Sequence, residues 1–95
     1  MSKGANNEVV REFKILNQYG IHARPAAMFV KLAARFDAEV YVEKDGNRVS
    51  GKSIMGLMTL EACHGTKLRV VAIGDDAEEA VQSIGELLDS KFGED

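Results

Sequence analysis

The sequence has few of the residues that hold small secreted domains together. Its 95 residues include one cysteine, one proline and no tryptophan. The single Cys63 cannot form an intramolecular disulfide, so a disulfide-stabilised secreted scaffold is excluded. Apolar runs extend over a few residues, far fewer than the roughly 20 that cross a membrane. Residues 1–8 lack the apolar segment of a signal peptide. We therefore expect a cytoplasmic protein without membrane insertion.

Basic charge and aromatic residues are also scarce. The chain has 12 Lys and Arg residues and 15 Asp and Glu residues, which give a net charge of -3, and it contains no run of basic residues. Nucleic acids and anionic membranes favour dense basic patches. RNA-binding sheets also need aromatic residues on their strands, and aromatics make up only 6% of the chain. Nucleic acid is therefore not an expected partner.

The length and the hydrophobic pattern predict one two-layer domain. A chain this short has room for a single core, so residues 1–95 are expected to form one domain with a loosely ordered extension over residues 1–8. Asp45-Gly46-Asn47 predicts a hairpin turn. Strands are expected over 9–16, 38–43, 48–51 and 67–73, and helices over 23–36, 54–61 and 77–88. This order favours an α/β two-layer sandwich with a mostly antiparallel sheet and its helices on one face.

One short segment, Gly20-Ile21-His22-Ala23-Arg24-Pro25-Ala26, contains the candidate chemistry. We expect His22 at the junction of a loop and a helix, where free backbone N–H groups and the helix dipole favour an anion. Imidazole is nucleophilic near neutral pH and could accept a phosphoryl group there, with Arg24 on its oxygens. From residue types alone, a polar loop histidine beside a solvated arginine is the simpler interpretation.

A second motif changes this interpretation. Lys52-Ser53-Ile54-Met55-Gly56-Leu57-Met58-Thr59-Leu60, together with the His22 segment and Phe29-Val30, closely resembles HPr. HPr is the histidine-containing phosphocarrier of the bacterial phosphoenolpyruvate-dependent phosphotransferase system. The resemblance extends from about Glu12 to Leu88, and two motifs in register are specific. It implies the HPr open-faced sandwich, a four-stranded antiparallel sheet with three helices on one side.

The resemblance also implies roles for single residues. His22 would accept phosphate from phosphorylated enzyme I, itself charged by phosphoenolpyruvate, and pass it to an EIIA-type domain. Arg24 matches the family's phosphate-stabilising arginine. The protein would be a carrier and not an enzyme, with no cofactor, and we expect a monomer.

The second motif suggests a regulatory and a docking role. Ser53 matches the serine that HPr kinase/phosphorylase modifies in many HPr proteins, although helix capping alone would explain a serine there equally well. Ile54, Met55 and Met58 are expected to be exposed on a short helix that contacts partners. Leu57 and Leu60 are expected in the core.

Two alternatives stay open, and one pair of residues is assigned no role. Residue Asn17, residues 36–40 and the acidic ending resemble the nitrogen-branch paralogue NPr, whereas residues 52–56 resemble the sugar-transport carrier. A purely regulatory module of this fold would lack the histidine. Cys63 and His64 are too few for zinc, which needs three or four ligands. They are expected at a helix end, with a small buried thiol and no metal.

Overall fold

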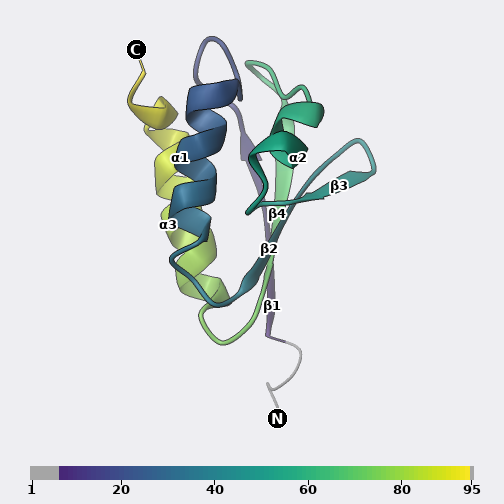
Figure 1. Ribbon diagram of the computed structural model, residues 1–95, viewed down its shortest axis with the longest axis vertical. Coiled ribbons are helices and arrows are strands. Elements are labelled where there is room, and N and C mark those ends of the chain that lie inside the picture. Colours follow the sequence, from purple (N-terminus) through teal and green to yellow (C-terminus); the bar gives the residue numbers. More distant parts are fainter. Residues whose placement is uncertain (1–6, 95) are drawn as a thin grey trace.

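The computed structural model describes residues 7–94, which form a four-stranded sheet and three α-helices. In chain order these are β1 (Glu8–Lys14), α1 (Ala23–Ala33), β2 (Glu39–Lys44), β3 (Asn47–Ser50), α2 (Ile54–Thr59), β4 (Lys67–Ile73) and α3 (Ala77–Asp89), followed by the 3-10 turn η2 (Lys91–Gly93). The sheet order is β1-β4-β2-β3, and every neighbouring pair is antiparallel. Figure 1 shows α1 and α3 next to each other, with α2 beside the first half of α1. The expected open-faced sandwich is confirmed.

The core lies between the sheet and the helices. Alternate residues of β2 and β4 face inward, as the period of two along a strand requires. The helices cover them with apolar stripes at helical spacing. Residues less than 3% exposed at this interface include Ala26, Phe29, Ala33, Val40, Val42, Leu68, Val70, Ala80, Ile84 and Leu88. No helix within residues 7–94 is long and apolar enough to cross a membrane.

The N-terminal boundary differs from the expected one. Glu8 already pairs with Ile73 at the start of β1, so the loosely ordered extension does not include it, and residues 1–6 lie outside the described part. The strand ends at Lys14, two residues earlier than expected. Ile15 follows the strand and is 1% exposed, and its backbone N–H donates to the Thr66 carbonyl.

The end of α2 also differs. The sequence predicts a helix over residues 54–61, but the helix ends at Thr59 with Leu60 as its C-cap. Glu61 takes the left-handed conformation there, with φ 53°. The Lys44 ammonium group donates to the Leu60 and Glu61 carbonyls at 3.0 and 3.2 Å. A basic group on the last carbonyls stabilises a helix end, so a residue distant in sequence helps to end α2.

Asp76 connects the start of α3 to the chain that precedes β2. Its carboxylate accepts hydrogen bonds from the backbone N–H groups of Asp37 and Ala38, at 2.9 and 2.8 Å. These bonds, chiefly the one from Asp37, hold the pKa of Asp76 below its ordinary value of 3.8. The ionised form of Asp76 is therefore the one that stabilises this connection.

Candidate functional site

His22 is the N-cap residue of α1, as the sequence predicts. Its backbone is extended (φ -99°, ψ -166°), and its side chain makes no capping hydrogen bond. Its carbonyl accepts the first helical bond, from Ala26 N at 2.9 Å. The side chain is 45% exposed, and the Tyr19 ring forms a T-shaped pair with it at 6.5 Å between centroids. The imidazole is therefore held at the helix start and is accessible to a partner.

The backbone before His22 is fixed by the chain that follows α2. The N–H of Ile21 donates to the Ala62 carbonyl at 2.9 Å. Gly20 lies directly against the backbone of Ala62 and Cys63 and has a φ of +69°. Glycine adopts this left-handed conformation without steric penalty. This contact between Gly20 and the backbone of residues 62–63 fixes the loop that leads into α1.

The first turn of α1 offers donors to an anion. N–H groups in the first turn of a helix have no partner within the helix, and Pro25 has no N–H to leave unpaired. The amides of Ala23 and Arg24 therefore remain available near the ring. The Arg24 guanidinium contacts Met28 Sδ at 3.6 Å and a Glu94 carboxylate oxygen at 3.5 Å. His22 and Arg24 thus meet at one point, where a phosphoryl group would find charged and uncharged donors.

Two further residues, which no sequence motif assigns to the chemistry, reach this point. Glu94 Oε2 lies 3.1 Å from His22 Nε2, and Glu94 Oε1 accepts a hydrogen bond from the Asn17 side-chain amide at 3.1 Å. Asn17 is fully buried, although it is a polar residue in the loop before His22. A signal for Asn17 exists, because asparagine at the first position and glycine at the fourth position are typical of a β-turn. No local pattern indicates Glu94.

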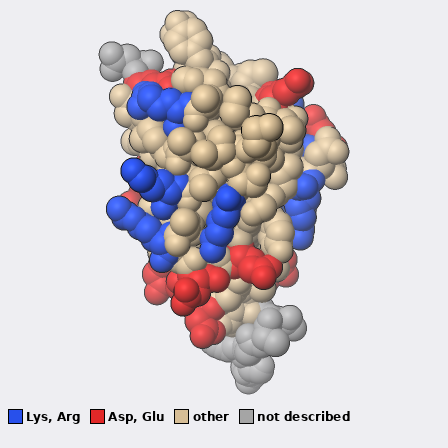
Figure 2. All heavy atoms as spheres, viewed as in Figure 1, with Lys and Arg blue, Asp and Glu red and all other residues tan. Residues whose placement is uncertain are grey.

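The short helix α2 presents the expected apolar surface. Ile54, Met55 and Met58 are exposed, Met55 by 75%, whereas Leu57 and Leu60 are buried. Because α2 packs against α1, this surface and the His22 region belong to neighbouring elements. Figure 2 shows basic side chains spread over the helices on one face, with uncharged surface between them. Most acidic side chains in this view gather at the lower end of the face, and a few lie at its upper end.

Ser53 caps α2. Its Oγ accepts a hydrogen bond from the Gly56 N–H at 2.9 Å, the expected capping geometry. The side chain is half-buried. Capping is therefore confirmed, and Ser53 is partly exposed to solvent.

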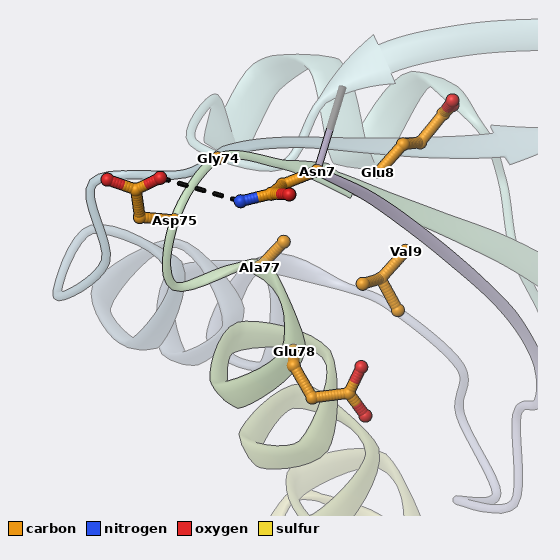
Figure 3. A pocket seen from close by; sticks show the side chains of 7 residues that line it. All are labelled: Asn7, Glu8, Val9, Gly74, Asp75, Ala77 and Glu78. Atoms are coloured by element: carbon orange, nitrogen blue, oxygen red, sulfur yellow. Dashed lines mark hydrogen bonds between the residues drawn. The ribbon is translucent and has the colours of Figure 1, made fainter. Parts of the chain in front are cut away.

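Elsewhere within residues 7–94, the structure brings no comparable chemistry together. Cys63 is exposed, contrary to the expected buried thiol, because α2 ends before it and its segment follows the surface. Among residues 7–94, no three His, Cys, Asp or Glu side chains are grouped to hold a metal. A hollow of about 390 Å³ lies between the start of β1 and the start of α3 (Figure 3). Asn7 Nδ2 donates a hydrogen bond to Asp75 Oδ1 at 3.5 Å beside this hollow. No histidine or cysteine lines the hollow.

Comparisons with known proteins agree with this geometry. Residues 9–90 match the family model described as PTS HPr component phosphorylation site. Phosphocarrier protein HPr of Treponema pallidum is 42% identical over 87 residues, covering 92% of this chain and 99% of the relative. HPr-like protein Crh of Bacillus subtilis is 43% identical, covering 80% of this chain and 89% of Crh.

Solved structures of HPr from Thermoanaerobacter tengcongensis have the same fold. One matches with a TM-score of 0.88 and 45% identity, covering 92% of this chain and 98% of the other. Another, described as an HPr dimer, matches with a TM-score of 0.74 and 48% identity, covering 86% and 94%. With a family model matched over most of its length, a histidine at the start of α1 and the open-faced sandwich around it, the chain belongs to the HPr family of phosphocarrier proteins of the phosphotransferase system.

Proposed function

We propose that this protein carries a phosphoryl group on His22, receiving it from phosphorylated enzyme I and delivering it to an EIIA-type domain. The observation that carries the proposal is the position of His22: a half-exposed imidazole at the N-cap of α1, with no capping bond of its own and the Arg24 side chain beside it. The first-turn amides and the guanidinium favour an anion on the ring. The protein then acts in the cytoplasm as substrate and donor, without turnover of its own.

The test uses the two histidines of the chain. The full-length protein is incubated with phosphoenolpyruvate and enzyme I, and the acid-labile phosphate is located by mass spectrometry. We expect one phosphate on His22 in the wild type, none in His22→Ala, and normal labelling in the control His64→Ala, because His64 is exposed on another segment. A labelled His22→Ala protein would contradict the proposal.

Partner proteins are proposed to dock on the surface formed by Ile54, Met55 and Met58 and on the start of α1. Methionine side chains adapt to differently shaped partners, and exposed apolar groups gain free energy when a partner covers them. The basic side chains spread over the helical face in Figure 2 suit acidic partner surfaces. Met55→Asp should weaken binding of enzyme I, and Val10→Asp, at an exposed apolar position on β1, should not. We propose a monomer as the acting form, which light scattering tests against a dimer.

A second function, regulation through Ser53, is favoured by the position of this partly exposed serine at the start of α2. A phosphate there would lie beside the Ile54, Met55 and Met58 surface and oppose its desolvation against enzyme I. Ser53→Asp should then be charged more slowly with an undiminished melting temperature, and Ser53→Ala should be charged normally. If Ser53→Asp is charged like the wild type and Ser53→Ala melts lower, Ser53 is a helix cap only.

The branch of the phosphotransferase system is decided by the acceptor. We propose the sugar-transport branch as the main one, on the motif at residues 52–56, with the nitrogen branch as the alternative. Transfer rates from the phosphorylated protein to a sugar-specific EIIA and to a nitrogen-regulatory EIIA, measured side by side, separate the two. A faster transfer to the regulatory EIIA would reverse this assignment.

A further inference from the structure

The Glu94 carboxylate is fully engaged at the His22 site. One oxygen faces His22 Nε2 at 3.1 Å and Arg24 Nη2 at 3.5 Å, and the other accepts the Asn17 amide at 3.1 Å. The Glu94 side chain is only 14% exposed. We propose that Glu94 is the carboxylate partner of His22 in phosphoryl transfer, and that Asn17 is the positioning residue that holds it there. This inference rests on the proposed role of His22.

The contact selects which ring nitrogen reacts. A carboxylate accepts hydrogen bonds and cannot donate them, and a neutral imidazole has one N–H and one lone pair. Glu94 therefore places the proton on Nε2 and leaves the lone pair on Nδ1. Nδ1 is on the other side of the ring, so the incoming phosphoryl group and the carboxylate occupy different positions.

The same contact stabilises the charge that the reaction creates. Attack by Nδ1 forms the nitrogen–phosphorus bond, and the bond from phosphorus to the donor breaks, leaving its electron pair on the donor. The imidazole keeps its Nε2 proton and becomes cationic. A carboxylate in hydrogen-bond contact stabilises an imidazolium in this way in hydrolytic triads. When the group is passed on, the electron pair of the nitrogen–phosphorus bond returns to Nδ1 and the ring is neutral again.

Asn17 is placed to hold the carboxylate. Its Nδ2 donates to the Gly20 carbonyl at 2.7 Å and to Glu94 Oε1 at 3.1 Å. The reversed amide would point its oxygen at two acceptors, so this orientation is the one consistent with both contacts. Asn17 Oδ1 is buried and has no hydrogen-bond partner among the described residues. The two N–H groups of the Asn17 amide therefore have separate partners. One fixes the loop before His22, and the other fixes the Glu94 carboxylate.

The chain after α3 brings Glu94 to the site. Lys91, Phe92 and Gly93 have φ values of 59°, 55° and 75°, which turn the backbone back toward α1. Phe92 is fully buried in the core and anchors this turn. Glu94 thus arrives by a defined path, with its N–H bonded to the Lys91 carbonyl at 2.9 Å.

The experiment measures the rate of charging by enzyme I in the full-length protein. Glu94→Gln keeps an oxygen that can accept from Nε2 and removes only the charge. We expect it to be charged on the order of tenfold more slowly, while Glu79→Gln, an exposed control with the same charge change, is charged like the wild type. A Glu94→Gln protein charged as fast as the wild type, or faster, overturns the proposal.

The Asn17 part is tested by non-additivity. Asn17→Ala should slow charging, and Asn17→Ala/Glu94→Gln should be no slower than the slower single variant, because both act through one contact. Multiplying effects would overturn the role of Asn17. If Asn17→Ala does not fold, Asn17→Asp is used in its place. Aspartate has the size of asparagine, and its carboxylate would repel the Glu94 carboxylate. The ring-nitrogen NMR shifts of His22, with the Nε2–H form expected, test the Glu94 contact even if enzyme I does not charge the wild type.

Discussion

Replacing Gly20 by alanine should disrupt the backbone that positions His22. The new Cβ would overlap the Ala62 carbonyl oxygen and lie 2.8 Å from Cys63 Cα. These are backbone atoms and cannot move aside as a flexible side chain does. The same carbonyl accepts the Ile21 N–H at 2.9 Å, so the clash falls on a bond that fixes the loop. Gly20→Ala therefore combines a backbone clash with an unfavourable left-handed conformation.

The two costs can be separated with Gly65. Gly65 also has a left-handed φ, +88°, but a Cβ there would meet nothing within 4 Å. Gly65→Ala should lower the free energy of unfolding by about 1–2 kcal/mol, the cost of that conformation for a residue with a Cβ. Gly20→Ala adds overpacking, typically about 1–3 kcal/mol, for a total of about 2–5 kcal/mol.

The assay is urea unfolding followed by circular dichroism, combined with the charging rate of His22. We expect a clearly larger loss of stability in Gly20→Ala than in Gly65→Ala, and slower charging only in Gly20→Ala. Equal losses of stability in the two variants would refute the argument, because the clash would then contribute nothing. Normal charging in a destabilised Gly20→Ala protein would show that the loop does not depend on this contact to position His22.

Three further perturbations test separate parts of the structure. Arg24→Ala should melt like the wild type, because Arg24 is mostly exposed. It should be charged at His22 about tenfold more slowly, because a hydrogen bond to a charged group contributes about 1.5–3 kcal/mol. Unchanged rates of charging and discharging would exclude its role. Asp76 has a lowered pKa, so its contribution to stability is present above its ordinary value of 3.8 and disappears as pH falls through the lowered one. Asp76→Asn should thus be less stable than the wild type at pH 7, and urea unfolding at acidic pH should show the difference narrowing; a constant difference would contradict this. Phe92→Ala should cost about 3–5 kcal/mol and release Glu94, seen as a change in the NMR signals of His22; unaltered signals in a folded variant would argue against Phe92 as the anchor.

Features that depend on neighbours in sequence could be predicted. The alternating pattern of β4, whose range matched the expected 67–73, arises because successive side chains point to opposite faces. The start of α1 at Ala23 and the Ser53 cap follow from local backbone chemistry. The exposure of Met55 and the burial of Leu57 follow from the spacing of residues on one helix turn. Element ends were less predictable, as α2 shows, because Lys44 contributes to its C-terminus from another strand.

The sequence by itself determined the order of the elements, the one-domain core and the placement of His22 and Arg24 at a helix start, since each depends on a periodicity or motif within a few residues. Only the tertiary structure decided what surrounds the imidazole. Glu94 is 72 residues from His22 and 77 from Asn17 in sequence, and their meeting depends on Phe92 filling the core at the end of α3. A carboxylate near a chain end and an asparagine in a turn look like solvated surface residues in the sequence. Packing alone brings them to the histidine, because it fixes the direction in which the chain turns after its last helix.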